Sequence, residues 1–342
     1  MARKNWYKNF SKGINRHYLK YVTDSRAKFL TERISLSIQI NNAYIQYAEN
    51  LERYLKVHSL KVDQQQLKIF LKSEQKKLAE ALAANFQTAL EHIIELGIAP
   101  SKQVFLDAVK AVTGEILGEA NIIEFLTKKG TLRAETIKDF YVKVNKEALD
   151  FYKSKTEINL SKALWEAAKD TNTVVIDIIK NSAKVGMDSF KTSKLLKDYI
   201  VHGGTAQGPL IRKLKEGGIK KYYVPKDVKF EALRLVRTET SLAFAEGVYQ
   251  GGQATPFYKG INWVLSASHD MVDECDDLAA QGFFPDGEEP IPPHPQCLCA
   301  QVPVYESPEE ASSNLKDWLK NPASQPDIED WFNKQFLPNI GG

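Results

Sequence analysis

The chain contains few cysteines and no long apolar run. Only three cysteines occur among its 342 residues. An odd number of thiols leaves one unpaired in any intramolecular pairing, which speaks against a secreted disulfide scaffold and for a reducing compartment. No stretch reaches the roughly 18 to 20 uninterrupted apolar residues that a membrane span needs. We therefore expect a soluble chain made in the cytoplasm, with no membrane partner.

Several functional signatures are also missing. The glycine-rich segment 202–209 lacks the Lys-Ser/Thr ending of a phosphate-binding loop. The N-terminus is basic but has no apolar signal-peptide core, so we expect no secretion by that route. A net charge of +3 is too small to indicate a nucleic-acid partner by itself. No internal repeat or low-complexity tract is found. With 43% hydrophobic and 26% charged residues, the composition is that of a folded globular protein.

The length favours two or more packed parts, since single domains usually have roughly 100–200 residues. Apolar residues repeat at helical spacing through the first half, and strand-like alternation occurs only in the second. We predict a mostly α N-terminal helical region followed by an α+β module with a small sheet and a Cys/His loop. The predicted parts are a basic aromatic arm (1–30), a long-helix domain (31–160), the α+β module (161–305) and short C-terminal helices (306–342).

Helix signals are strongest in the N-terminal half. Leucine, isoleucine and phenylalanine recur at helical spacing from Asp63 to Gly97, and Gly97 with Pro100 predicts the end of this helix. A second helix is predicted from Ser101 toward Gly130 and a third after Thr131.

The second half mixes helices with short strands. The predicted helices are Ser161–Lys169, Thr173–Lys184, Ser189–Val201, a long helix after Pro225, and two short helices around Trp318 and Trp331; the predicted strands are Ile219–Val224, "INWVLSAS" and "CAQVPVY".

Basic residues dominate the first thirty positions, where Asp24 is the single acid. Aromatic side chains lie among them, including Trp6, Tyr18 and Tyr21. This combination suits a phosphate-binding and base-stacking surface, and it equally suits a solvated helix face or a docking arm. The candidate nucleic-acid ligands are Arg3, Lys4, Lys8, Lys12, Arg16 and Lys20.

All three thiols lie within a 25-residue window that also contains a histidine between prolines. Cys275, His294, Cys297 and Cys299 supply three sulfurs and one imidazole, the donors of a structural zinc site. The neighbouring prolines restrict the ligand loop. The pair Cys297 and Cys299 has one intervening residue, whereas zinc motifs usually have two to four. Residues two apart in an extended chain point to the same face, so both thiols can reach one ion.

Other interpretations of the window stay open. Cys275 could form a disulfide with one of the pair, or the cysteines could be buried free thiols beside a surface histidine. A cysteine nucleophile would need a histidine base, for which His294 or His269 could serve, but no oxyanion or substrate motif surrounds them. We therefore predict no enzyme. Arg237, Thr238 and Glu239 lie on a predicted helix, where ion pairs explain the charges more simply than a nucleotide pocket does.

Several consecutive elements of this region form one pattern: an Arg-Thr-Glu helix, a tryptophan strand, an acid-and-cysteine turn and a Pro-Pro-His-Pro-x-Cys-x-Cys ending. The residues that form it are Arg237, Thr238, Glu239, Trp263, Asp270, Cys275, Asp276, Gly282, Pro292, Pro293, His294, Pro295, Cys297 and Cys299. Together these elements resemble the phage Mu F-like, or phage head morphogenesis, family of minor capsid proteins. The resemblance covers about residues 173–304. The family commonly has His-Pro-Asn-Cys-Arg-Cys, and this chain has Gln296 and Leu298 at the Asn and Arg positions.

The resemblance implies a structural component of the virion, present in few copies inside the capsid. It implies association with the portal vertex and a role in procapsid assembly, DNA packaging or ejection. The implied partners are the portal protein, the major capsid or scaffolding protein, and packaged DNA. Some family members carry toxin domains, so the alternative is a phage-encoded effector or enzyme that uses the Cys/His or Arg-Thr-Glu residues.

Overall fold

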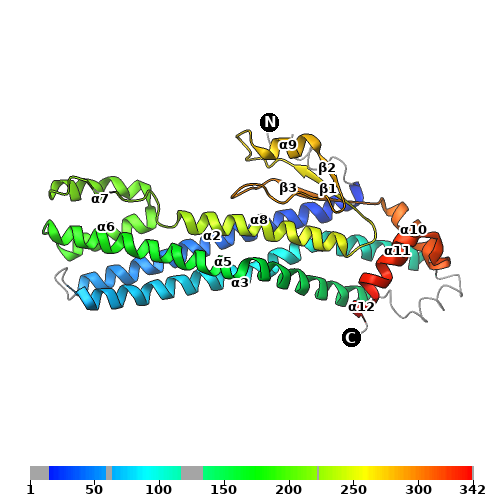
Figure 1. Cartoon of the computed structure of the whole chain (residues 1–342), viewed down its shortest axis with the longest axis horizontal. Coiled ribbons are helices and arrows are strands. Elements are labelled where there is room, and N and C mark those ends of the chain that lie inside the picture. Colours follow the sequence, from blue (N-terminus) through cyan, green and yellow to red (C-terminus); the bar gives the residue numbers. More distant parts are fainter. Residues whose placement is uncertain (1–14, 59–63, 117–133, 222, 341–342) are drawn as a thin grey trace. The chain divides into compact units, whose positions relative to one another are not determined.

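The computed structural model describes residues 15–58, 64–116, 134–221 and 223–340 (Figure 1). The predicted fold class is confirmed, because long helices are followed by a small antiparallel sheet and a Cys/His cluster. Among the helices in these ranges, none is both long and apolar enough to span a bilayer.

Helices make up the described chain as far as residue 253. They are α2 (Arg16–Val57), α3 (Gln64–Ile116), α5 (Ala134–Lys184), α6 (Ser189–His202), α7 (Gly204–Glu216) and α8 (Phe230–Gln253). The sheet region then contains β1 (Tyr258–Val264), α9 (Glu274–Gln281), β2 (Phe283–Pro285) and β3 (Ala300–Tyr305). The C-terminal elements are α10 (Pro308–Lys320), the 3-10 turn η1 (Pro322–Ser324), α11 (Pro326–Trp331), the π-helical turn η2 (Phe332–Phe336) and α12 (Leu337–Ile340).

The chain forms two compact units, each assembled from separate stretches. Unit 1 consists of Met1–Glu32, Leu90–Ser154 and Thr238–Gly342, and unit 2 of Arg33–Ala89 and Lys155–Arg237. The boundaries fall inside α2, α3, α5 and α8, so each of these helices contributes residues to both units. The four predicted domain ranges stay predictions.

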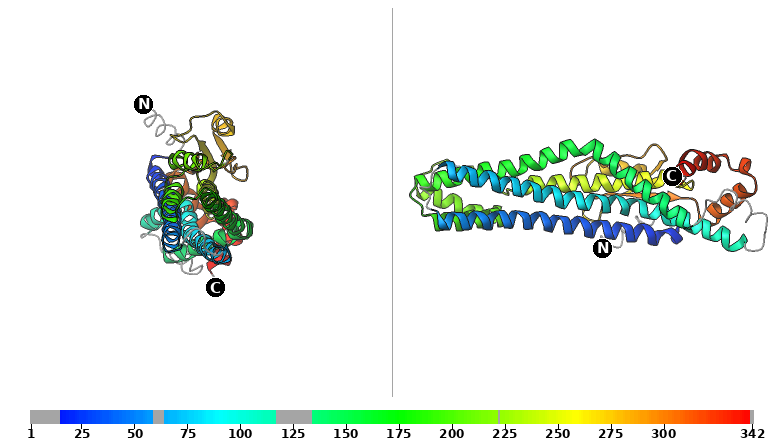
Figure 2. Two further views of the ribbon diagram at one scale, coloured as in Figure 1. Left: turned by 90° about the vertical axis from the view of Figure 1, so that its left-hand side faces the viewer. Right: turned by 90° about the horizontal axis from the view of Figure 1, so that it is seen from below.

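Helices are the only regular secondary structure among the described residues of unit 2. Its segments of α2, α3 and α5 run alongside one another (Figure 2). A buried polar link joins all three, because Tyr47 donates a hydrogen bond of 2.5 Å to Asn172, and the Asn172 amide donates to the Leu71 carbonyl at 2.7 Å. Such satisfied buried groups fix the register of helices that apolar packing alone would leave free to slide.

Unit 1 contains the sheet, in which β1 is the central strand and the order is β2-β1-β3. Both pairings are antiparallel, with Ile261 opposite Phe284 on one side and opposite Pro303 on the other. The strands predicted in "INWVLSAS" and "CAQVPVY" are thus confirmed as β1 and β3. Trp263 is buried on β1. The short strand β2 was not predicted, because three residues are too few to show alternation.

Aromatic side chains attach the C-terminal elements to the helices of unit 1. The Phe105 ring meets the Trp331 ring edge-on, with centroids 5.2 Å apart, and Phe140 lies 4.9 Å from Phe336. The two short helices predicted around Trp318 and Trp331 are confirmed as α10 and α11.

The predicted helix end at Gly97 and Pro100 is wrong, since α3 continues through both residues. Gly97 serves close packing instead. A Cβ atom there would lie 2.6 Å from the Phe244 carbonyl oxygen on α8, and one on Gly247 would lie 2.3 Å from the Ile94 carbonyl oxygen. The glycines therefore allow the α3 and α8 backbones to touch, and tertiary packing overrides the local stop signal.

Three other element predictions also fail. The helices predicted at Ser161–Lys169 and Thr173–Lys184 are parts of the continuous α5, and α7 was not predicted. Among the described residues of Ile219–Val224, which exclude residue 222, no strand is found. Lys220, Lys221 and Tyr223 are exposed there, and Val224 alone among the described residues of this segment is buried, so the alternation of a half-buried strand is lacking. Residues 101–116 are helical as predicted, but they belong to α3, so the predicted helix start at Ser101 is wrong; the remainder of this predicted helix lies outside the described residues.

Candidate metal centre

The thiol window of unit 1 folds around the start of α9. Asp273 is the N-cap of this helix, and its carboxylate accepts a hydrogen bond from the Cys275 backbone N–H at 2.8 Å. Asp276 completes the capping box by accepting from the Asp273 N–H at 2.9 Å. This cap fixes the first turn of α9 and with it the position of Cys275. Cys297 and Cys299 come from the segment that leads into β3.

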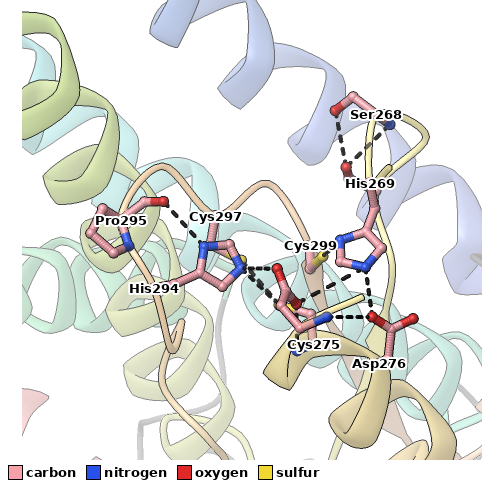
Figure 3. Close-up of polar contacts among 10 residues, drawn as sticks. Ser268, His269, Cys275, Asp276, His294, Pro295, Cys297 and Cys299 are labelled. Atoms are coloured by element: carbon pink, nitrogen blue, oxygen red, sulfur yellow. Dashed lines mark hydrogen bonds and ion pairs between the residues drawn. The ribbon is translucent and has the colours of Figure 1, made fainter. Parts of the chain in front are cut away.

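Three of the four predicted ligands, Cys275, His294 and Cys297, converge in the structure (Figure 3), whereas Cys299 is not part of this group. The Cys275 Sγ atom lies 3.6 Å from Cys297 Sγ and 3.2 Å from His294 Nε2. These three side chains form a group that could hold a metal ion. Cys275, Cys297 and Cys299 are 0%, 2% and 8% exposed, so water has little access to the sulfurs.

A second histidine, which our sequence analysis did not include among the ligands, borders the cluster. His269 Nδ1 lies 3.9 Å from Cys299 Sγ, and His269 Nε2 lies 2.9 Å from an Asp276 carboxylate oxygen (Figure 3). The hydrogen bond that the Asp276 carboxylate accepts from His269 raises the pKa of His269. The pKa of Asp276 is lowered, first by the Asp273 backbone N–H and then by His269. The sequence feature that could have identified His269 is its position six residues before Cys275. The neighbouring Asp270, which was included in the predicted motif, is exposed.

Two of the buried thiols, those of Cys275 and Cys299, are poor acids in this environment. Burial raises the pKa of the Cys275 thiol to about 12, and the neighbouring Cys299 adds to the effect. The pKa of Cys299 is also raised, first by its hydrogen bond with Cys297 and then by burial. All three cysteines are free, and the Cys275–Cys297 separation of 3.6 Å far exceeds the roughly 2.05 Å of a disulfide. The structure therefore has three free cysteines without a disulfide, and the raised pKa values of Cys275 and Cys299 keep these two thiols protonated at neutral pH.

Three side chains from α8 and α2 hold the ligand loop by its backbone. The Gln296 N–H donates to Thr238 Oγ1 at 3.0 Å, Ser241 donates to the Cys297 carbonyl at 2.7 Å, and Arg26 donates to the Leu298 carbonyl at 2.5 Å. Consecutive peptide groups are thus fixed on both sides of Cys297. Gln296 has a φ of 61°, a left-handed conformation that most residues avoid. The loop is held in a shape that local preference alone would not produce.

The remaining residues of the predicted motif have structural contacts. Glu239 accepts a hydrogen bond from Tyr152 at 2.6 Å, and in unit 2 the Arg237 carbonyl accepts one from Arg33 at 3.4 Å. Arg234 pairs with Glu231 at 3.4 Å, as an ion pair on a helix face should. The two loop prolines of the prediction, 293 and 295, are exposed.

The predicted nucleic-acid residues divide into two groups. Arg3, Lys4, Lys8 and Lys12 lie outside the described residues. Arg16 and Lys20 are exposed on α2. Tyr18 cannot serve as a stacking platform, because it is buried and its ring packs edge-on against Tyr305, with centroids 5.9 Å apart.

Comparisons of the chain with protein-family models, with curated proteins and with solved structures give no match. The resemblance to the head morphogenesis family accordingly stays a prediction drawn from the motif residues.

Proposed function

We propose that the Cys/His cluster is a structural zinc site that fixes the C-terminal part of unit 1. The observation that carries this proposal is the convergence of the Cys275, Cys297 and His294 donor atoms. Tetrahedral zinc, with bonds of about 2.3 Å to sulfur and about 2.0 Å to nitrogen, holds neighbouring donors about 3.5 to 3.8 Å apart. The observed separations of 3.6 Å and 3.2 Å are close to that spacing.

The proposed ligands are Cys275, Cys297, Cys299 and His294, which bind through three sulfurs and Nε2. The other nitrogen of His294 lies 3.1 Å from the Pro295 carbonyl, a contact that orients the ring for binding through Nε2. His269 supports the site from outside. Its Nδ1 faces Cys299, and its pairing with Asp276 favours the charged imidazolium, which offsets the negative charge of three thiolates.

A structural role suits this arrangement better than a catalytic one. Four protein ligands close the coordination shell, whereas catalytic zinc keeps a position open for water or substrate. The raised pKa of Cys275 leaves its thiol protonated at neutral pH when no metal is bound, which is the opposite of an activated nucleophile. We therefore propose that the chain is not an enzyme.

Metal analysis of protein purified without added zinc tests the site. About one zinc per chain is expected in the wild type, with Cys297→Ser and His294→Ala reducing the content strongly. His202→Ala changes a histidine whose side chain is 60% exposed and serves as the control. His269→Ala should retain the metal with weaker affinity. Equal zinc content in all variants would contradict the ligand assignment.

We further propose that the chain is a minor capsid or head morphogenesis protein that acts at the portal vertex, inside the virion. Its support is that the motif residues from Thr238 to Cys299 all belong to unit 1. Thr238 and Gln296 are 58 positions apart and share a hydrogen bond. Gln296 also occupies the position where the family commonly has Asn, the residue type that best tolerates a positive φ after glycine.

Quantitative mass spectrometry of purified phage or prophage particles, with and without external protease, tests this role. A few copies per particle that survive the protease are expected for a minor component inside the head. Absence from particles that contain the portal protein would contradict it, whatever the outcome for zinc.

A further inference from the structure

Charge is divided unevenly between the two units. Unit 2 has 25 lysines and arginines and 14 aspartates and glutamates, a net charge of +11, whereas unit 1 has 21 and 29, a net charge of −8. The small net charge of the chain therefore conceals a strongly basic unit and an acidic one.

The basic charge of unit 2 is concentrated in one stretch. Residues 180–221 contain ten lysines and arginines but three acids, which are Asp188, Asp198 and Glu216. This stretch includes the end of α5, all of α6 and α7, and the residues that follow α7. Nine of the ten basic side chains are exposed, and only Lys197 is half-buried.

The packing of the Val185 side chain against Gly217 brings part of this charge to one place. A Cβ atom on Gly217, at the end of α7, would lie 2.3 Å from the Val185 Cβ atom, just after the end of α5. The Ile219 N–H donates to the Leu214 carbonyl at 3.0 Å, and Gly218 has a φ of 94°. This is the hydrogen-bond pattern that ends helices with a left-handed residue, and it ends α7 next to Val185, just after the end of α5. We call the six exposed residues around this contact the lysine surface: Lys180, Lys184, Lys213, Lys215, Lys220 and Lys221.

Acidic side chains balance little of this charge. Glu216 forms ion pairs with Arg212 at 3.8 Å and with Lys213 at 3.0 Å, so one carboxylate neutralises part of the charge of two cations. For the other five members of the lysine surface, no ion pair is found within the described part of the chain. Their charges thus face solvent together, although like charges in proximity repel one another.

Favourable interaction with the helix dipole explains the positions of only three of the six lysines in the lysine surface. Lysines in a last turn interact favourably with the helix dipole, by roughly 0.3–1 kcal/mol each. Lys184 in α5 and Lys213 and Lys215 in α7 occupy such positions. Lys180 lies a full turn earlier, and Lys220 and Lys221 lie beyond the end of α7, so the dipole gives no reason for them.

We propose that the lysine surface binds the phosphate backbone of nucleic acid without sequence preference. Its members are all lysines, which act as point charges and lack the planar fork with which arginine reads a guanine edge. Each exposed ammonium group can neutralise one phosphate, and the release of condensed counterions drives such binding. The inference does not rest on the metal site, and it places the contact in unit 2 rather than in the N-terminal arm.

Fluorescence anisotropy with a labelled 30-bp duplex of random sequence tests the surface in the full chain. Six phosphate contacts predict a slope of log K against log salt of about −5, since each contact contributes about −0.9. The variant Lys215→Gln, Lys220→Gln, Lys221→Gln should reduce the slope by about 2.7 units. The matched control is Lys68→Gln, Lys72→Gln, Lys76→Gln, which removes the same charge from exposed positions on α3 in the same unit. It should bind the duplex like the wild type.

Three outcomes would overturn the proposal. One is the absence of salt-dependent duplex binding. Another is an equal loss in the control variant, which would show that net charge alone matters. The third is loss of binding in Arg3→Gln, Lys4→Gln, Lys8→Gln, Lys12→Gln with the lysine surface intact. If the surface instead meets the acidic unit of a second copy, light scattering will show salt-dependent self-association without duplex binding. Cys297→Ser should bind the duplex normally, so failure of the zinc site leaves this result unaffected.

Discussion

Zinc removal should lower the thermal stability of unit 1 by an amount that follows from its topology. The proposed site cross-links Cys275 to Cys297, which are 22 residues apart in the sequence. A cross-link that closes a loop of this length reduces the entropy of the unfolded chain, by about 3 kcal/mol at 25 °C according to the relation used for disulfides. His294 and Cys299 lie at the same end of the loop, so they add little further closure.

This free energy converts into a measurable shift. Unit 1 comprises about 200 residues. For parts of this size, 1 kcal/mol corresponds to about 2–4 °C in Tm, so chelation should lower the transition of unit 1 by about 6–12 °C. The hydrogen bonds from Thr238, Ser241 and Arg26 to the loop backbone remain without metal, so unit 1 should stay folded at room temperature.

Differential scanning calorimetry, with and without a chelator and then with zinc restored, measures the effect. In Cys297→Ser the transition should already be low, and the chelator should leave it unchanged. An unchanged transition in wild-type protein shown by metal analysis to have lost its zinc would refute the reasoning, because the loop would then be fixed by its hydrogen bonds alone.

Three shorter predictions follow from other parts of unit 1 and unit 2. Gly247→Ala should destabilise unit 1 by about 1–3 kcal/mol in denaturant titrations, because the added Cβ would meet backbone atoms of α3. The control is Gly208→Ala in α7, where an added Cβ meets nothing within 4 Å, and it should be neutral or stabilising. Gln296→Asn should raise the stability of unit 1 by about 0.5–1 kcal/mol, since asparagine tolerates the left-handed backbone better; a loss would show that the glutamine side chain makes a needed contact. Zinc affinity should rise with pH between 6 and 8, because the raised pKa of Cys275 keeps its thiol protonated there and zinc must displace the proton; a pH-independent affinity would argue against thiolate ligands.

The metal ligands that lie close together in the sequence were predictable, whereas the residues that hydrogen-bond to the ligand loop were not. Cys275, His294 and Cys297 could be grouped because thiols and imidazoles are rare here and lie within one window. Hydrogen-bond supports carry no comparable signal, since serine and threonine occur throughout the chain. Ser241 lies 56 positions before Cys297, and only the fold brings it within 2.7 Å of that carbonyl.

Glycine shows why local signals mislead within long helices. Gly97, followed closely by Pro100, has the sequence pattern of a helix end, and Gly247 and Gly251 have no helix-forming advantage. In the structure, the three glycines Gly97, Gly247 and Gly251 lie where α3 and α8 approach each other. A Cβ on Gly251, for example, would lie 2.8 Å from the Ile98 Cα atom. Gly218, by contrast, does follow a helix end and has a positive φ. Sequence alone does not separate the two uses, because the difference lies in what crosses the helix at that point.

Basic residues illustrate the same limit for function. The first thirty positions attracted a nucleic-acid prediction because their charges are dense and unopposed in sequence. In the structure, one of those basic side chains, Arg26, is not available to a partner because it is buried. Its guanidinium lies 4.8 Å from the centre of the Phe29 ring and donates a hydrogen bond to the carbonyl of Leu298, the residue between Cys297 and Cys299. The stretch 180–221 is less conspicuous, because its lysines are spaced among apolar residues that α6 and α7 bury. Whether a cation is available to a partner depends on what the fold places beside it, and by that criterion the lysine surface of unit 2 is the stronger candidate for a phosphate contact.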